Sequence, residues 1–232
     1  MKSILFVPAR KGSTGLKGKN LINLNGKPLI DYTLKLSQKF PKEFILFVST
    51  DSKKIKDYSK KYGFKEDYLR PKKLSTSKSN IVDGIIDGIE WLKKNKDYEI
   101  EDVILLQPTS PLRKYSDIQK AYKIYKKKKL LSLTSVTKVR ENSLGHIKID
   151  KNKQSWNFLY KSRKKLFRRQ DFPRGHYIFN GSFYFCNYSF LKRNRVLVKE
   201  NLTYLYPTSR LTSVDIDFES DLKIAEAIMK YK

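Results

Sequence analysis

Residues 3–20 contain an apolar run that leads directly into a loop of glycines and basic side chains. Glycine lets the backbone turn tightly and brings its N–H groups close to anionic oxygens, while basic side chains neutralise the remaining charge. This combination predicts a polyphosphate site, with a solvated turn between a strand and a helix as the alternative for the loop taken alone. The residues concerned are Gly12, Gly15 and Gly18 together with Arg10, Lys11, Lys17 and Lys19.

The spacing of this loop differs from the two commonest phosphate-binding patterns. A Walker A loop ending at Gly18 and Lys19 requires glycine at position 13 and serine or threonine at position 20. The chain has Ser13 and Asn20 there, and the dinucleotide fingerprint G-x-G-x-x-G also fails at Ser13. The sequence therefore argues against an ATPase of that type and against an NAD enzyme.

A pair of carboxylates near the C-terminus could hold a metal ion. Asp215 and Asp217 alternate with apolar residues over positions 213–218, which predicts a strand with both carboxylates on one side, roughly 7 Å apart. Like charges at that spacing repel unless a cation lies between them, and oxygen ligands favour Mg²⁺, which adds water and substrate phosphate. The alternative is a half-exposed edge strand in which Asp217 caps a helix starting near Glu219.

The segment 107–113, Gln-Pro-Thr-Ser-Pro-Leu-Arg, follows another apolar run. Its two prolines hold the chain extended and so fix the directions of Gln107, Thr109 and Ser110. A rigid polar loop suits recognition of a sugar or a base. The alternative is a proline-rich exit turn with Arg113 in solvent.

A basic segment at residues 168–173, Arg-Arg-Gln-Asp-Phe-Pro, precedes the run Tyr177–Gly181. Arginine can bind a carboxylate through two parallel hydrogen bonds, so this segment could hold an acidic substrate. Taken alone, such a run is more often a solvated basic surface.

Apolar runs alternate with helical stretches through the first 138 residues. This order predicts an α/β fold with a mainly parallel sheet and helices on both faces. Ligands of such sheets bind beyond the carboxyl ends of the strands, so we expect Arg10, Asp51, Arg70 and Gln107 to gather at one edge. The expected strands are 3–7, 44–48, 64–68, 103–106 and 131–137, and the expected helices begin at Pro28 or span 53–62, 81–93 and 116–127.

The pattern changes between residues 139 and 181. Residues 146–149 and 156–160 predict two antiparallel hairpin strands, which cannot bury much surface by themselves. We therefore expect residues 1–138 and 182–232 to form a nucleotide-binding core, and residues 139–181 to form an arm that packs against a second copy in a homodimer.

The formal net charge of +27 would fit a nucleic-acid-binding protein, which is the alternative from a different functional class. The lysines are spread along the whole chain, however, and a binding domain would concentrate them on one stripe. The sequence has no apolar run long enough to span a membrane and no recognisable leader, so we expect a cytoplasmic protein without a membrane or nucleic-acid partner. Cys186 is the only cysteine and lies in an apolar run, which predicts burial.

The motifs described above occur together, in order and at the spacing of one family. The chain resembles the acylneuraminate cytidylyltransferases, or CMP-sialic acid synthetases, over nearly its whole length. The segment 107–113 and the Asp-x-Asp pair carry the most specific part of this resemblance. It implies a Rossmann-like nucleotidyltransferase fold and transfer of CMP from CTP to the anomeric hydroxyl of a nonulosonic sugar acid, with release of pyrophosphate.

The resemblance also implies roles for individual residues. Arg10, Lys19 and Asp217 would be catalytic, and Asp215 and Asp217 would hold Mg²⁺. Arg169 would bind the carboxylate of the sugar acid, from its own or the partner subunit. CTP would be bound by Ala9, Arg10, Ser13, Asn20 and Arg70, and the sugar by Gln107, Thr109, Ser110, Arg169 and Asn180.

Two departures from the family pattern concern the substrates. Many members have Gly-Gly-Ser-Lys-Gly where this chain has Lys11-Gly-Ser-Thr-Gly15, so Thr14 replaces a basic residue. Some sialic acid enzymes carry an arginine just before Asn-Gly, where this chain has Ile178 and Phe179. Neuraminic, legionaminic and pseudaminic acids all remain open as the substrate, and a CMP-Kdo synthetase is the alternative within the enzyme class.

Overall fold

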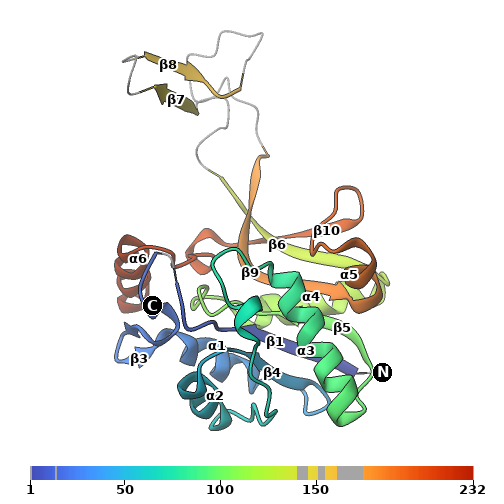
Figure 1. Cartoon of the computed structure of the whole chain (residues 1–232). Coiled ribbons are helices and arrows are strands. Elements are labelled where there is room, and N and C mark those ends of the chain that lie inside the picture. The colour runs from blue at the N-terminus through green and yellow to red at the C-terminus, as the bar shows by residue number, and fades with distance from the viewer. Residues whose placement is uncertain (1, 14, 140–145, 151–154, 161–174, 232) are drawn as a thin grey trace.

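The computed structural model describes residues 2–13, 15–139, 146–150, 155–160 and 175–231. Its main feature is a six-stranded sheet with the strand order β10-β6-β9-β5-β1-β4. Helices lie on both faces of this sheet (Figure 1). The predicted α/β fold is confirmed.

The helices and strands follow the predicted alternation. The strands are β1 Lys2–Pro8, β2 Asn23–Leu24, β3 Lys27–Pro28, β4 Ile45–Ser49, β5 Ile100–Leu105, β6 Ser132–Lys138, β7 Ile147–Asp150, β8 Ser155–Phe158, β9 Tyr177–Asn187 and β10 Thr203–Thr208. The α-helices are α1 Leu29–Ser37, α2 Lys53–Lys60, α3 Ile81–Lys96, α4 Tyr115–Lys127, α5 Tyr188–Asn194 and α6 Glu219–Lys230.

Strand β1 lies inside the sheet, between β5 and the edge strand β4, and is buried on both faces, as its continuous apolar run requires. Leu5 and Val7 pack with residues of α1, α2 and α4 on one face. Ile4 and Phe6 pack with α3 and α5 on the other. A third apolar cluster joins α6 to the loops at the end of the sheet.

Strand β9 is antiparallel to both of its neighbours, β5 and β6, whereas β1 pairs in parallel with β4 and β5, and β6 with β10. The chain leaves β6 at Lys138 and re-enters the sheet at Tyr177, which pairs with Lys138. Because it returns at the edge from which it left, β9 must run in the opposite direction. The N-terminal half of β9 therefore lies beside the carboxyl ends of the parallel strands, where ligands of such sheets bind.

A bulge interrupts β9 within this half. Thr134 of β6 pairs with Tyr184, but Val136 pairs with Phe179, so Ser135 faces residues 180–183. Gly181 in the bulge has a φ of 69°, a conformation that glycine adopts at little cost. Bulges of this kind bend a strand and redirect its side chains, often beside active sites.

The segment between β6 and β9 carries the predicted hairpin, in which β7 and β8 pair antiparallel. This hairpin stands away from the six-stranded sheet (Figure 1). Ile147 and Ile149 of β7 are exposed. The core sheet includes Tyr177–Gly181, so the arm ends earlier than the expected boundary at residue 181, and the packing of the arm against a second copy stays a prediction.

Two predicted strands are absent from the described part of the chain. Residues 64–68 bury Phe64 and Tyr68 in the apolar clusters on opposite faces of the sheet without pairing as a strand. Their backbone leads past the end of β4, and the next contact is made by the Arg70 N–H, which donates to the Thr50 carbonyl over 2.8 Å. The alternating burial of residues 64–68 therefore arises because Phe64 and Tyr68 pack separately, one on each face of the sheet.

Residues 213–218 are also irregular, and the predicted strand at Asp215 and Asp217 is wrong. Ile216 is fully buried, but Phe218 is 65% exposed and does not share its environment. The Ile216 N–H donates to the Thr109 carbonyl over 2.8 Å, which anchors the segment to a loop. The chain then turns into α6, whose first turn is capped by the Asp221 carboxylate.

Cys186 is fully buried among apolar residues, as predicted, and burial raises the pKa of its thiol to about 12. Among the described residues, no helix is long and apolar enough to cross a membrane.

Two glycines of α3 give a matched test of how tightly this helix packs on the sheet. A Cβ at Gly88 would lie 2.7 Å from the Phe47 ring, whereas one at Gly84 would reach only ordinary contact with Arg70, at 3.8 Å. We expect Gly88→Ala to lower the free energy of unfolding by about 1–3 kcal/mol through overpacking. Gly84→Ala should raise it by up to about 1 kcal/mol, because alanine favours the helix. Urea unfolding measures both, and equal effects would contradict the packing.

Candidate active site

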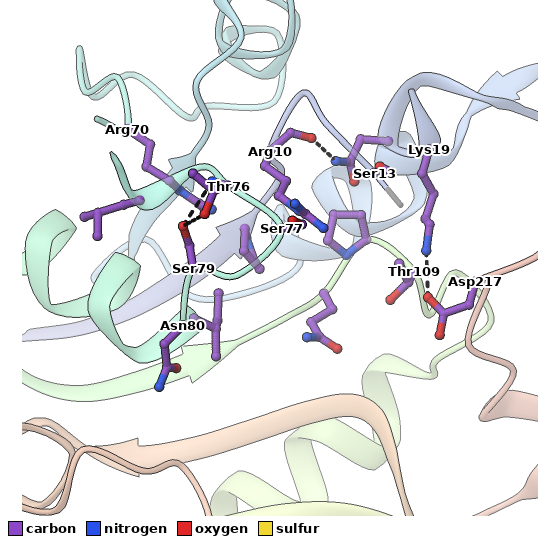
Figure 2. Close-up of a pocket in the computed structure, with 16 residues that line it drawn as sticks. Arg10, Ser13, Lys19, Arg70, Thr76, Ser77, Ser79, Asn80, Thr109 and Asp217 are labelled. Carbon is purple, nitrogen blue, oxygen red and sulfur yellow. Dashed lines mark hydrogen bonds and ion pairs between the residues drawn. The ribbon is translucent and has the colours of Figure 1, made fainter. Parts of the chain in front are cut away.

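A pocket of about 270 Å³ lies at the carboxyl edge of the sheet (Figure 2). It collects residues from four segments that are far apart in the sequence. The predicted site residues that line it are Arg10, Ser13, Lys19, Asn20, Arg70, Gln107, Thr109 and Asp217.

The glycine-rich loop follows β1 and is held in place by its own side chains. Asn20 is buried, and its Nδ2 donates to the Arg10 carbonyl over 2.8 Å. The Lys11 N–H donates to the Asp51 carboxylate over 2.6 Å, which ties the loop to the end of β4. Gly18 has a φ of 66° and precedes a short 3-10 helix, Lys19–Leu21. The loop therefore presents Arg10, Ser13 and Lys19 to the pocket from a fixed backbone.

Lys19 and Asp217 meet across the pocket. The Lys19 Nζ lies 2.6 Å from an Asp217 carboxylate oxygen, and the Asp217 side chain is 61% exposed. The cap of α6 does not use Asp217, because the Asp221 carboxylate accepts the N–H groups of Asp217 and Phe218. The predicted capping role of Asp217 is thus taken by Asp221, and Asp217 is free to act in the pocket.

The loop after β5 is rigid for a reason beyond its prolines. Arg113 is buried, its Nε donates to the Ser110 carbonyl over 2.8 Å, and its Nη2 donates to the Gln107 carbonyl. Burial lowers the pKa of the guanidinium to about 9, which leaves it charged at neutral pH. The solvated position for Arg113 is therefore wrong, and the guanidinium sets the shape of the loop that carries Gln107 and Thr109.

Asp215 differs from Asp217 in being largely enclosed. Its Oδ1 is buried without a hydrogen-bond partner in the described structure. Burial raises the pKa of this carboxyl, and the hydrogen bond from the Thr109 side chain opposes the rise. A buried carboxylate oxygen without a donor is costly unless a cation or a proton satisfies it.

Gly181 brings Asp215 and Gln107 to a common point. A Cβ on Gly181 would lie 3.0 Å from Gln107 Oε1 and 3.2 Å from Asp215 Oδ2. The bulge of β9 therefore forms a wall against which these two oxygen-bearing side chains are placed.

Arg70 lines the other side of the pocket and is almost completely buried, with 6% of its surface exposed. Its Nε donates to the Ser49 hydroxyl over 2.8 Å and its Nη2 to the Ser49 carbonyl over 2.7 Å. Burial lowers the pKa of this guanidinium too. The bonds to Ser49 hold the cation in one orientation beside the end of β4.

The segment between Arg70 and α3 also contributes to the pocket and was not predicted from the sequence. Thr76, Ser77, Ser79 and Asn80 line the pocket on the side of Arg70 (Figure 2). The Thr76 N–H donates to Ser79 Oγ over 3.0 Å, and Asn80 caps α3 by accepting from the Val82 N–H. The sequence does contain a signal for this segment, because a run of short polar residues before an amphipathic helix marks the N-terminal cap of that helix.

Of the other predicted residues that the structure describes, Ala9, Ser110, Asn180 and Asp215 do not line the pocket. Ala9 is buried behind it, and its N–H donates to the Ser49 carbonyl over 2.9 Å. Ser110 is buried and its hydroxyl has no described partner. Asn180 is buried with its amide bonded to other side chains. Arg169 and Thr14 lie outside the described residues.

In the described part of the chain, no group of three or more histidine, cysteine, aspartate or glutamate side chains could hold a metal ion. A divalent cation in this pocket would therefore depend on Asp215 and Asp217 and on oxygens supplied by water or substrate. Mg²⁺ is commonly bound in this way, through one or two carboxylates and substrate phosphates.

The pocket combines two kinds of chemical group. The basic side chains of Arg10, Lys19 and Arg70 suit a phosphorylated nucleotide. Gln107 on its rigid loop suits an uncharged acceptor group, and Asp217, with Asp215 two residues before it, suits a cation. A pocket of this kind at the carboxyl edge of a mainly parallel sheet is typical of a nucleotidyltransferase.

Comparison with known families makes this class specific. Residues 4–230 match the cytidylyltransferase family, so the chain belongs to that family and is a cytidylyltransferase of the CMP-sialic acid synthetase type. The family inferred from the sequence motifs is confirmed.

Three relatives illustrate the range of the family. The chain is 32% identical to a CMP-N,N'-diacetyllegionaminic acid synthase of Legionella pneumophila, covering 99% of this chain and 97% of the relative. It is 28% identical to a pseudaminic acid cytidylyltransferase of Campylobacter jejuni, covering 99% and 97%. It is 30% identical to an N-acylneuraminate cytidylyltransferase of Streptococcus agalactiae, covering 95% of this chain but 52% of that longer protein.

Solved structures support the fold. A CMP:2-keto-3-deoxy-manno-octonic acid synthetase complexed with CTP superposes with a TM-score of 0.68 at 16% identity, covering 100% of this chain and 99% of the other. A 4-diphosphocytidyl-2C-methyl-D-erythritol synthase from Anaerococcus prevotii superposes with a TM-score of 0.62 at 15% identity, covering 99% and 96%.

Proposed function

We propose that this chain transfers CMP from CTP to the anomeric hydroxyl of a nonulosonic sugar acid and releases pyrophosphate. The observation that carries the proposal is the convergence of the glycine-rich loop, Arg70, Gln107 and Asp217 on one pocket. The names of the relatives support this class of acceptor, because they include legionaminic, pseudaminic and neuraminic acids.

CTP would lie along the basic side chains of the pocket. Arg10, Ser13 and Lys19 are placed to hold the triphosphate, since they extend from one loop whose backbone is fixed by Asn20. The hydroxyl-bearing segment at Thr76 and Ser79, next to Arg70, would hydrogen-bond the nucleoside. Such an arrangement fixes the α-phosphorus relative to the acceptor, and positioning is the main requirement of this reaction.

The two aspartates fit a magnesium site. The buried, unpartnered Oδ1 of Asp215 could be satisfied by a cation, and Asp217 adds an exposed carboxylate on the same segment. Mg²⁺, when bound, would neutralise charge on the triphosphate and on the departing pyrophosphate. The contact between Lys19 and Asp217 keeps the carboxylate directed toward the phosphate-binding loop.

The chemical step needs no covalent intermediate. The anomeric hydroxyl oxygen forms a bond to the α-phosphorus as the bond from that phosphorus to the bridging oxygen of pyrophosphate breaks. Asp217 would orient this hydroxyl and accept its proton, while Arg10 and Lys19 would stabilise the charge that develops on pyrophosphate.

The acidic end of the acceptor would be held by a guanidinium. Arg169 is our candidate for this role, and Gln107 and Thr109, which line the pocket, would bind the sugar hydroxyls. We further propose a cytoplasmic homodimer in which the arm that carries β7 and β8 packs against the second copy. The exposed apolar side chains of Ile147 and Ile149 support that packing.

The proposal is tested by measuring pyrophosphate release. We expect release only when CTP, Mg²⁺ and a nonulosonic acid are all present, with the legionaminic, pseudaminic and neuraminic acids compared in parallel. Kdo, an eight-carbon sugar acid, is tested as a further acceptor. Faster pyrophosphate release with Kdo than with the nine-carbon acids would identify Kdo as the substrate. Salt-dependent binding of RNA or DNA, without turnover of CTP, would instead favour a nucleic-acid-binding protein.

A further inference from the structure

The side-chain amide of Asn180 is fully engaged inside the protein. The Ser135 hydroxyl donates to Asn180 Oδ1 over 2.6 Å, and the Ser182 N–H donates to the same oxygen over 3.1 Å. Asn180 Nδ2 donates to Thr208 Oγ1 over 2.7 Å and to Ser213 Oγ over 3.1 Å. The backbone donor at Ser182 identifies the oxygen side of the amide, because an N–H group can only donate.

These bonds join three parts of the sheet edge. Ser135 belongs to β6, Thr208 ends β10, and Ser213 lies two residues before Asp215. Ser213 is held a second time, since its hydroxyl lies 2.8 Å from that of Thr208. With 6% of its surface exposed, Asn180 has no free donor or acceptor to offer the pocket.

The same network supports the β9 bulge. The bulge spans the residues that face Ser135, and it brings Gly181 so near the acceptor groups that an added Cβ would lie 3.0 Å from Gln107 Oε1 and 3.2 Å from Asp215 Oδ2. Asn180 therefore connects to Asp215 by two routes: through Gly181 on its own strand and through Ser213 on the segment leading to the aspartate. Loss of the Asn180 amide would remove both of these connections to Asp215.

We propose that Asn180 is a positioning residue that sets the relative placement of Asp215 and Gln107, and that it does not contact the sugar. The inference rests on the proposed function, since it concerns residues proposed to act on the sugar acid and the metal ion. It replaces the sugar-binding role expected for Asn180 from family resemblance. Buried polar networks that orient reacting groups commonly affect activity by 10–100-fold when broken.

The test removes the partners of Asn180. Thr208→Val and Ser213→Ala each delete one hydroxyl that accepts from the amide, and Asn180→Ala deletes the amide itself. Thr208→Ser keeps the hydroxyl and serves as the conservative variant. Thr134→Val is the matched control, because Thr134 is a buried hydroxyl on the same strand as Ser135 with no described partner.

We expect Thr208→Val and Ser213→Ala to lower kcat/KM for the sugar acid by about 10-fold and Asn180→Ala by up to about 100-fold. The KM for CTP should stay within about twofold, because Arg10, Lys19 and Arg70 are not part of the Asn180 network. Thr208→Ser and Thr134→Val should retain near wild-type activity. Thermal unfolding of each variant shows whether a lower kcat/KM for the sugar acid comes from misplaced site residues or from loss of the fold.

A direct sugar contact predicts a different pattern. Asn180→Ala would then be inactive while Thr208→Val and Ser213→Ala keep full activity, and that result would overturn the inference. Full activity of Asn180→Ala would overturn it too. Failure of the proposed function is recognised separately, because wild-type protein would then release no pyrophosphate with any sugar acid.

Discussion

Asp217→Ala is expected to lower kcat for CMP transfer by at least about 100-fold while the protein remains folded. The carboxylate is 61% exposed, and its described partner is Lys19 on the phosphate-binding loop. An exposed ion pair contributes little to stability, so its loss should leave the unfolding temperature almost unchanged. The expected effect therefore arises from the lost cation ligand and hydroxyl acceptor, and steady-state pyrophosphate release measures it.

Glu219→Gln is the matched control for this variant. It removes one negative charge close to Asp217 in the sequence, where the Glu219 carboxylate pairs with Lys223 on the surface of α6. We expect a rate close to that of the wild type. A Mg²⁺ titration should require a higher metal concentration for Asp217→Ala alone. Wild-type rate and metal dependence in Asp217→Ala would show that Asp217 has neither role.

Gly15→Ala is expected to lower kcat/KM by about 100-fold through a change of shape alone. A Cβ on Gly15 would lie 2.3 Å from the backbone carbonyl oxygen of Asp217. A carbonyl oxygen cannot rotate away as a flexible side chain can, so the phosphate-binding loop and the segment carrying the aspartates must separate. Lys19 and Asp217 would then lose the relative placement that the reaction needs.

Gly12→Ala provides the comparison within the same loop. A Cβ on Gly12 would meet no atom within 4 Å, and its backbone does not adopt a positive φ. We expect a much smaller loss than for Gly15→Ala, although both substitutions add the same methyl group. Equal kcat/KM values for the two variants would contradict the close approach of the loop to Asp217. Thermal unfolding identifies any variant that has lost its fold.

Much of the fold was predictable because its signals are local. The apolar run of β1, the helix after Pro28 and the order of strands and helices each reflect burial and periodicity over a few residues. The reversal of β9 was not predicted, because direction depends on where the intervening segment leaves and re-enters the sheet. Residues 64–68 were misassigned because two anchors on opposite faces mimic the alternation of a strand.

The candidate site was predicted best where a motif and a strand end coincide. Arg10, Arg70 and Gln107 each follow a strand or a buried segment, and the structure brings them into one pocket. Ser79 and Asn80 were missed because short polar residues before a helix ordinarily act only as caps. Asn180 was assigned to the sugar, yet its amide bonds inward to residues that lie far from it in the sequence.

The two aspartates show where the information lies. From the amino-acid sequence follow two carboxylates that stand two residues apart near the C-terminus, in a chain whose motifs indicate a cytidylyltransferase. The different surroundings of these carboxylates are visible only in the folded chain, where Asp215 is enclosed by Thr109 and Gly181 while Asp217 reaches Lys19 in the open pocket. Residue type and spacing are local properties, whereas burial and charge environment depend on segments that the whole sheet brings together.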